Sequence, residues 1–372
     1  MADNDTIASL ATTVDDFLRS AYDADTRRRI LSSAGERWSL MPALAELGTF
    51  AVTVGEEHGG LGLPLSTLGP IFIQYGRHLL AGPMLENSLV PGTMYDHVSE
   101  EGRKLLADVV ENGSTLAFLD PAVTDHWSGR LGSVTSVDGR LSGTFEAVRF
   151  GGEAIAILVV ADRDGRSLLH LIEPTMPGVR IEAVGSADPA ADFSRVTLDG
   201  VEGIPVGDAA TAPEVLARVR RWSRVLIACE LSGVATRCVE LAVEYAKQRE
   251  QFGKIIGSFQ AIKHMLADMH TDAVSLHNFC EAVAGELDGL SGAEADISAA
   301  ALKAHAATVA VSVCEGAIQI HGGIGFTAEA EIHWYYKRAL ALRAWYGDST
   351  ELEEQVGAMV LDEPTARTVE RV

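Results

Sequence analysis

Three side chains near residue 250 are of the types that bind a phosphorylated ring compound. The segment Tyr-Ala-Lys-Gln-Arg-Glu-Gln-Phe-Gly-Lys places Arg249 and Phe252 next to a turn, and Gln260 follows shortly after. A guanidinium binds phosphate oxygens through paired hydrogen bonds, and an aromatic face packs against a heterocycle. These residues therefore suit a pyrophosphate with an attached ring. Helix charges are commonly just solvated, so the spacing alone leaves open that Arg249 faces water and Phe252 fills a helix bundle.

A second segment with binding potential runs from Gly316 to Phe326 and contains Gln319 followed by the pair Gly322-Gly323. Glycine has no Cβ to hold a ligand away, so its backbone amide approaches a phosphate or an adenine closely. The same pair is also typical of the C-cap of an apolar helix. His321, which precedes it, suits a packed or hydrogen-bonded side chain better than a catalytic one.

Composition limits the partners that such a site serves. The chain has 372 residues, 47% of them hydrophobic, which indicates a globular protein of two or three domains. Its 30 Lys and Arg against 52 Asp and Glu give a net charge of −22, which argues against nucleic acid or an anionic membrane as the main partner. The four cysteines lie far apart in sequence, which predicts reduced thiols and no metal site. Because the N-terminal residues lack the pattern of a signal peptide, we expect a cytoplasmic protein.

Three consecutive stretches of the chain show different periodicities. Residues 1–112 have helical spacing, and residues 113–208 contain short apolar runs separated by Asp-Gly pairs at 138, 164 and 199, which predict hairpins between strands. In residues 209–372 the helical period returns, with an apolar seam from Ile227 to Tyr245 that continues from Ile262 to Cys280. The sequence therefore predicts a helical domain, a β domain and a C-terminal helical bundle, with ligands bound where the domains meet.

Taken together and in this order, the motifs resemble those of the acyl-CoA dehydrogenase family, and the similarity covers most of the chain. The stretch Trp38–Gly48, followed by Glu-Glu-His-Gly-Gly-Leu-Gly at 56–62, is similar to the family's Pro-Glu-x-x-Gly-Gly-Leu-Gly turn. The resemblance implies an α+β fold with a helical N-terminal domain, a β-barrel-like middle domain and a C-terminal four-helix bundle. It also implies FAD as cofactor and α,β-dehydrogenation of a CoA thioester.

Family members share FAD across a dimer interface. The resemblance therefore implies that six residues grip the ADP half of an FAD seated mainly in the partner subunit, namely Arg249, Phe252, Gln260, Gln319, Gly322 and Gly323.

The catalytic glutamate of the family has no counterpart at either of its two known positions. Counting the family's usual spacing from Gln319 reaches Trp345-Tyr346-Gly347-Asp348, so that Tyr346 stands at the base position. Some members carry the base just before an arginine on the first long helix, and here Ser223 precedes that arginine, Arg224. A phenol with a pKa near 10 is a poor base at neutral pH, and a serine without a base of its own does not replace a carboxylate. Asp348 and Glu351 remain as displaced candidates.

The β domain departs from the family pattern as well. Where the family has Thr-Glu-Pro-x-x-Gly-Ser-Asp, this chain reads Leu-Asp-Pro-Ala-Val-Thr-Asp-His at 119–126. The family's Gly-x-Lys-x-Trp-Ile-Thr segment corresponds to residues 143–149, in which Ala147 and Arg149 replace the two neighbours of the flavin.

The retained residues belong to the half-site that a subunit lends to its partner, whereas the altered residues belong to its own half-site. We therefore expect a non-catalytic subunit that pairs with a homologous catalytic acyl-CoA dehydrogenase, similar to the α2β2 heterotetramers of actinobacterial steroid-CoA dehydrogenases, which act in lipid or steroid degradation. Two alternatives stay open. One is an active homomeric flavoenzyme that uses Asp348 or Glu351 as base, or resembles the family's monooxygenases and oxidases. The other is a scaffold protein that binds no flavin.

Overall fold

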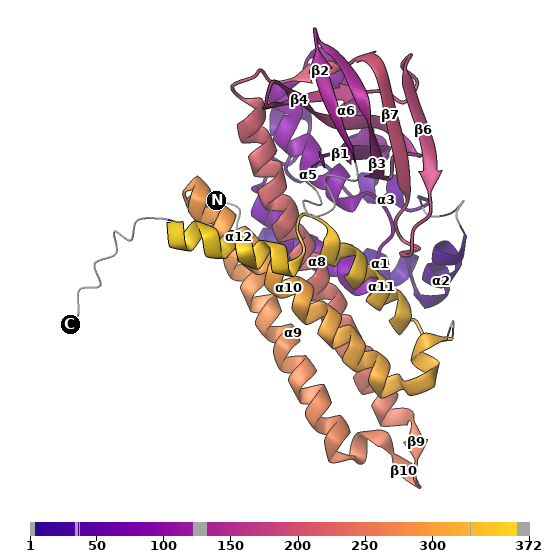
Figure 1. The fold of residues 1–372 in the computed structure, drawn as a ribbon. Helices are drawn as coiled ribbons and strands as arrows, with labels where there is room; N and C mark the ends of the chain where they lie inside the picture. Colours follow the sequence, from indigo (N-terminus) through magenta and orange to yellow (C-terminus); the bar gives the residue numbers. More distant parts are fainter. Residues whose placement is uncertain (1–3, 34–35, 37, 122–131, 328, 363–372) are drawn as a thin grey trace, which may run out of the picture.

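The computed structural model describes residues 4–33, 36, 38–121, 132–327 and 329–362. Within these residues, helices precede a block of strands, and longer helices follow it (Figure 1). The predicted α+β class is therefore confirmed. The N-terminal helices are α1 (Asn4–Ala21), α2 (Ala24–Ser32), α3 (Met41–Glu46), α4 (Leu68–His78), α5 (Met84–Met94) and α6 (Glu100–Asn112).

The strands form one sheet in the order β6-β7-β3-β2-β4-β5-β8, with β1 added to β4. Two of the three Asp-Gly pairs make the expected hairpin turns, between β2 and β3 and between β4 and β5, where both residues of each pair have positive φ. The strands are β1 (Thr115–Leu119), β2 (Gly132–Val137), β3 (Arg140–Arg149), β4 (Ala154–Arg163), β5 (Arg166–Ile172), β6 (Val179–Val184), β7 (Phe193–Glu202) and β8 (Ile204–Val206).

The third Asp-Gly pair corrects the sequence-based prediction. Asp199 and Gly200 lie inside β7, where the pairing register with β3 shifts between Leu141 and Gly143. Gly200 has a φ of 65°, and its N–H donates to the Ser142 hydroxyl at 3.1 Å. The pair is therefore a β-bulge and not a hairpin turn, because the same left-handed glycine serves both structures.

The C-terminal helices are α8 (Ala212–Gln248), α9 (Gln260–Glu286), α10 (Gly292–His321), α11 (Ile332–Ala344) and α12 (Ser349–Asp362). The apolar seam predicted on the first of them is largely buried, with Ile227, Leu231, Val234 and Cys238 facing the core. α10 and the turn that follows it are long and apolar enough to cross a membrane. However, 67% of the apolar 18-residue stretch within them is buried, as in the core helix of a globular domain.

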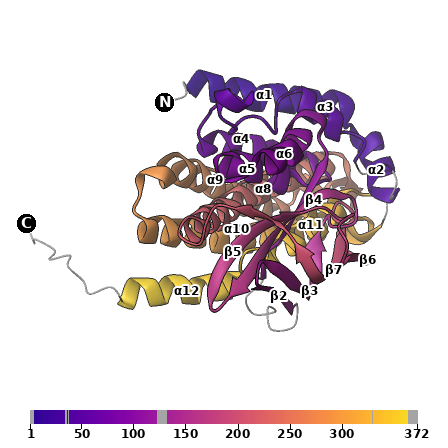
Figure 2. The same cartoon turned by 90° about the horizontal axis from the view of Figure 1, so that it is seen from above.

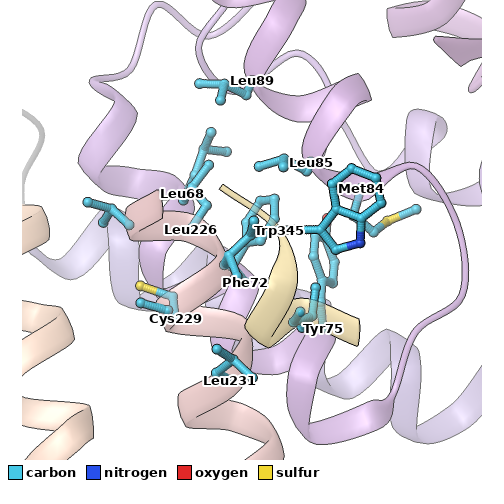
Figure 3. Close-up of a cluster of buried hydrophobic side chains, with 14 of the residues drawn as sticks. Leu68, Phe72, Tyr75, Met84, Leu85, Leu89, Leu226, Cys229, Leu231 and Trp345 are labelled. Carbon is cyan, nitrogen blue, oxygen red and sulfur yellow. The ribbon is translucent and has the colours of Figure 1, made fainter. Parts of the chain in front are cut away.

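One apolar core joins the N-terminal helices to the C-terminal bundle. Figure 2 shows the N-terminal helices on one side of α8 and the strands on the other. In Figure 3, side chains of α4, α5 and α8 meet around Phe72, and Trp345, from the turn between α11 and α12, lies beside Met84. The turn that carries Trp345 is therefore anchored in the centre of the molecule.

The four cysteines are all buried and free. They are distant in sequence but not in space, since the sulfur atoms of Cys238 on α8 and Cys314 on α10 lie 3.4 Å apart.

Candidate functional site

A tight hairpin after α8 presents Phe252 to solvent. β9 (Glu250–Gln251) pairs with β10 (Lys254–Ile255), and the two turn residues, Phe252 and Gly253, have φ of 54° and 77°. Positive φ at both positions is the type I′ geometry that glycine and asparagine favour, and it costs a residue with a bulky side chain on the order of 1 kcal/mol. The Phe252 side chain is 92% exposed. An exposed aromatic held in a strained turn is better suited to binding than to packing.

Arg249 and Gln260 flank this hairpin. Arg249 ends α8, and its carbonyl accepts a hydrogen bond from the Ile256 N–H at 2.8 Å, which closes the base of the hairpin. Its guanidinium is exposed and has no side-chain partner among the described residues. Gln260 is the first residue of α9 and is exposed as well. The structure thus brings all three predicted binding residues of this segment to one exposed end of the bundle.

The second predicted segment, at the end of α10, lies at the same end of the bundle (Figure 1). Its residues line a groove. The groove has a volume of about 540 Å³, and its lining includes Gln319, Gly322, Gly323 and Phe326. Gly322 ends α10 with φ 65° and ψ −143°, a combination that only glycine adopts readily. Phe326 is 73% exposed. Gln319 and the glycine pair therefore remain open to a ligand.

His321 links the two segments without taking part in the groove. Its ring stacks on Tyr245 of α8 with the centroids 4.4 Å apart, and its Nδ1 lies 2.7 Å from the Ala317 carbonyl oxygen. Burial lowers the pKa of His321, so the ring is neutral at pH 7 and Nδ1–H donates to that carbonyl. His321 is therefore a packed side chain that holds α8 against α10.

The two sequence positions expected for a catalytic base meet inside the protein. Tyr346 is 5% exposed and Ser223 is 1% exposed. Burial raises the pKa of the Tyr346 phenol strongly, Asp120 raises it further, and Ser223 opposes the shift. The Arg224 Nε–H donates to the Tyr346 carbonyl at 3.0 Å. A phenol in these surroundings stays protonated and does not act as a general base.

The two displaced candidates for the base act in the cap of α12. The Thr350 N–H donates to the Asp348 carboxylate at 2.9 Å, Arg343 pairs with the same carboxylate at 3.0 Å, and the Asp348 N–H donates to Glu351 at 3.2 Å. Partial burial acts to raise the pKa of Asp348, but the hydrogen bonds from Thr350 and Arg343 outweigh it and leave the pKa below its usual value. Both carboxylates are thus held in a helix cap.

Arg149 fills the space beside Tyr346 in the β domain. Its guanidinium carbon lies 5.0 Å from the centre of the Phe150 ring and 5.3 Å from that of Trp345, and its Nη1 lies 3.7 Å from the Glu86 carboxylate. Trp345 in turn stacks on Phe193. These side chains form a continuous buried layer between β3, β7 and the turn after α11. Ala147 precedes the layer on β3 and is half-buried.

The segment at 119–126 is only partly visible. Leu119 ends β1, and Asp120 is fully buried and receives two hydrogen bonds from Arg220 of α8, at 2.6 and 2.8 Å. The departure from the family's Gly-Ser, which falls on residues 122–126, lies outside the described residues.

Sequence reasoning missed a buried cluster of charges next to this layer. Arg338 of α11 pairs with Asp188 at 3.0 Å and with Glu230 of α8 at 3.1 Å, while Glu86 pairs with Arg149. Burial raises the pKa of Glu86 and of Glu230, and the neighbouring arginines oppose that shift. One signal was present in the sequence, because Glu230 interrupts an otherwise apolar seam.

Comparison with known proteins shows which family this chain resembles. Residues 215–361 match the family model described as acyl-CoA dehydrogenase, C-terminal domain. The acyl-CoA dehydrogenase IpdE2 of Mycobacterium tuberculosis is 28% identical to this chain over 336 residues, which cover 90% of this chain and 89% of that protein.

Solved structures share the fold over nearly the whole chain. The ChsE4-ChsE5 complex from Mycobacterium tuberculosis is similar with a TM-score of 0.85 and 22% identity, over 98% of this chain and 99% of that one. A variant of the Tcur3481-Tcur3483 steroid ACAD has a TM-score of 0.84 and 24% identity, over 96% and 98%. An acyl-CoA dehydrogenase complexed with FAD from Bacillus anthracis has a TM-score of 0.83 and 20% identity, over 96% and 67%.

Proposed function

Because residues 215–361 match the acyl-CoA dehydrogenase C-terminal domain and the whole chain has that fold, we propose that this protein is the non-catalytic subunit of an FAD-dependent acyl-CoA dehydrogenase. In this proposal it completes the FAD site of a homologous catalytic subunit in an α2β2 heterotetramer. The observation that carries the proposal is the contrast between an open outer groove at Gln319 and a base position filled by the buried Tyr346.

The residues at the end of the bundle fit the ADP half of FAD. Arg249 offers the pyrophosphate a guanidinium that has no side-chain partner among the described residues, and Phe252 offers an exposed ring face. Gln319 offers polar contacts in the groove, beside a glycine pair that has no Cβ atoms to hold a ligand away. FAD, when bound, would supply the acceptor for the hydride that the thioester loses. This chain contributes binding and orientation of the cofactor, because these residues point outward and away from its own interior.

The chain's own half-site is unsuited to the same chemistry. Proton abstraction from a thioester needs a carboxylate, and the position expected for it holds a phenol with a raised pKa. Asp348 and Glu351 are engaged at the start of α12, which argues against a homomeric enzyme with a displaced base. Arg149 occupies the place of a flavin neighbour and is sandwiched between Phe150 and Trp345.

The structural relatives favour a heteromeric assembly with a lipid substrate. Two of them are named by a pair of chains: ChsE4-ChsE5, which is described as a complex, and Tcur3481-Tcur3483, which is described as a steroid ACAD. We therefore propose the CoA thioester of a steroid-derived or other bulky acyl group as the substrate of the complex, bound mainly by the partner.

The test is co-production of this chain with the candidate catalytic acyl-CoA dehydrogenases of the same genome, followed by measurement of FAD per pair of chains. We expect one FAD for every two unlike chains and no activity from this chain alone. The variant Arg249→Ala lowers the FAD content of the complex by tenfold or more at a limiting FAD concentration, whereas Lys247→Ala, which removes an exposed cation two residues away, does not.

Two outcomes contradict the proposal. A yellow, active protein from this chain alone, with one FAD per chain, indicates the homomeric enzyme. An assembled complex whose FAD content is unchanged by Arg249→Ala indicates a scaffold.

A further inference from the structure

A fully buried lysine ties the two ends of the turn between α11 and α12. Lys303 of α10 has no exposed surface, and its Nζ donates to the carbonyls of Arg343 at 3.1 Å and Gly347 at 3.2 Å. Between these carbonyls lie Trp345 and Tyr346, the two aromatic residues that fill the interior of the chain. The lysine therefore bridges the segment that places both rings.

The turn needs such support because its backbone is strained. Tyr346 has a φ of 58°, which costs a non-glycine residue about 1 kcal/mol, and Gly347 has a φ of 109°. From the opposite side, Arg224 of α8 donates to the Tyr346 carbonyl at 3.0 Å. Lys303 of α10 and Arg224 of α8 thus donate to three carbonyls at the end of α11 and in the turn after it, those of Arg343, Tyr346 and Gly347.

The number of hydrogen-bond acceptors around Lys303 matches a neutral amine. A neutral amine has two N–H groups, and the structure gives Nζ two carbonyl acceptors. An ammonium carries a third N–H and a full charge, both of which are costly in a buried site.

Burial is the main cause that lowers the pKa of Lys303, which lies at about 7. Of the charges around it, Arg224 of α8 and Arg343 of α11 also lower the pKa, whereas Asp348 in the turn and Glu351 of α12 raise it.

We propose that Lys303 is the positioning residue of this turn, and that the turn closes most tightly when the Lys303 amine is neutral, so that proton uptake loosens it. In the open turn the lysine is hydrated and has an ordinary pKa near 10.4. The open form therefore binds a proton that the closed form lacks between about pH 7 and pH 10. Opening becomes easier as the pH falls through this range and levels off below about pH 7, where both forms carry the proton. The inference rests on contacts within this chain and does not depend on the proposed function.

The test is hydrogen exchange of the 345–347 amides in the full-length protein at pH values from 6 to 9.5, corrected for the intrinsic exchange rate at each pH. We expect the opening constant to rise by up to tenfold for each pH unit from pH 9.5 to about pH 7 and to level off below. In Lys303→Met, which has neither donor nor titratable group, the opening constant is larger and independent of pH. Lys337→Met, which changes an exposed lysine of α11, follows the wild type.

A second variant keeps the test decisive if Lys303→Met does not fold. Asp348→Asn removes a charge that supports protonated Lys303, so the levelling-off moves to lower pH. An opening constant in the wild type that is equal at pH 7 and pH 9.5 overturns the proposal, as does a pH profile that persists in Lys303→Met.

Discussion

The guanidinium of Arg338 meets the carboxylate of Asp188 at 3.0 Å, and both side chains are only 2% exposed. Arg338 lies on α11, and Asp188 lies between β6 and β7, so this contact fixes the sheet to the C-terminal helices. Glu230 of α8 accepts a hydrogen bond from Nη1 of the same guanidinium at 3.1 Å. Charges at this depth are tolerated only in mutual pairs, because each lost its hydration on folding.

Removal of the shared cation should therefore be costly. We expect Arg338→Met to lower the free energy of unfolding by about 3–5 kcal/mol, since it removes the cation that pairs with two buried carboxylates. Urea unfolding measures the difference. The control Lys337→Met, an exposed neighbour on α11, should change stability by less than about 0.5 kcal/mol. Equal loss in both variants would show that the buried pairing contributes nothing specific.

Restoring a carboxylate at the base position should not restore an enzyme. Tyr346→Glu places a carboxyl group in a buried space near Asp120 and Glu86, so we expect a lower unfolding midpoint and a protonated side chain. Arg149 still fills the adjacent layer. The purified variant should still contain far less than one FAD per chain, as measured by its flavin absorbance. A yellow protein with dehydrogenase activity would refute the view that several side chains close this half-site.

Local patterns predicted the fold well, because its main elements follow periodic or turn signals. The apolar seam of α8 and the hairpin turns at Asp138 and Asp164 depend on neighbours in sequence, and the structure has them. The Asp199-Gly200 bulge was missed because the same dipeptide makes either structure. The motif spacing placed Tyr346 at the base position, but the burial of its ring depends on contacts with distant segments.

The buried charge cluster shows where sequence reasoning ends. Glu86, Asp188, Glu230 and Arg338 come from four separate segments, and no local signal pairs them. Only Glu230, which interrupts an apolar seam, indicates burial in the sequence; the other three resemble ordinary surface charges. Only the tertiary arrangement makes them partners, as it does for the thiols of Cys238 and Cys314.

A buried histidine should make the protein sensitive to acid. His170 of β5 is 6% exposed, and burial lowers its pKa while the backbone of Gly203 opposes the shift. The unfolded chain, with a histidine pKa near 6.5, binds a proton that the folded chain resists. The contribution of His170 to the free energy of unfolding is therefore fully present above about pH 6.5. It falls by up to about 1.4 kcal/mol for each pH unit below that value.

The matching variant is His170→Leu, which has no titratable group. Urea midpoints measured from pH 7.5 to pH 5 should fall less steeply for it than for the wild type. His264→Gln, a change at an exposed position on α9, should leave the wild-type slope unaltered. Parallel curves for His170→Leu and the wild type would rule out this residue as a source of the acid sensitivity.

Relief of the strain in the hairpin should stabilise the isolated chain and weaken FAD binding. Asn is favoured in the type I′ position that Phe252 occupies, so we expect Phe252→Asn to stabilise the isolated chain by about 0.5–1 kcal/mol. The same change removes the exposed ring, and the proposed complex with a partner subunit should retain less FAD after gel filtration. Unchanged FAD retention would show that the ring has no role in binding.

The exposed aromatic side chains of Phe252 and Phe326, at the end of the bundle, also affect how long the unassembled chain persists in the cell. In the proposed heteromer, a newly made chain without its counterpart exposes apolar surface of the kind that chaperones and proteases recognise. Under that proposal its cellular level should follow the supply of its counterpart, so that matched synthesis of the two polypeptides becomes a requirement imposed by the surface of one chain.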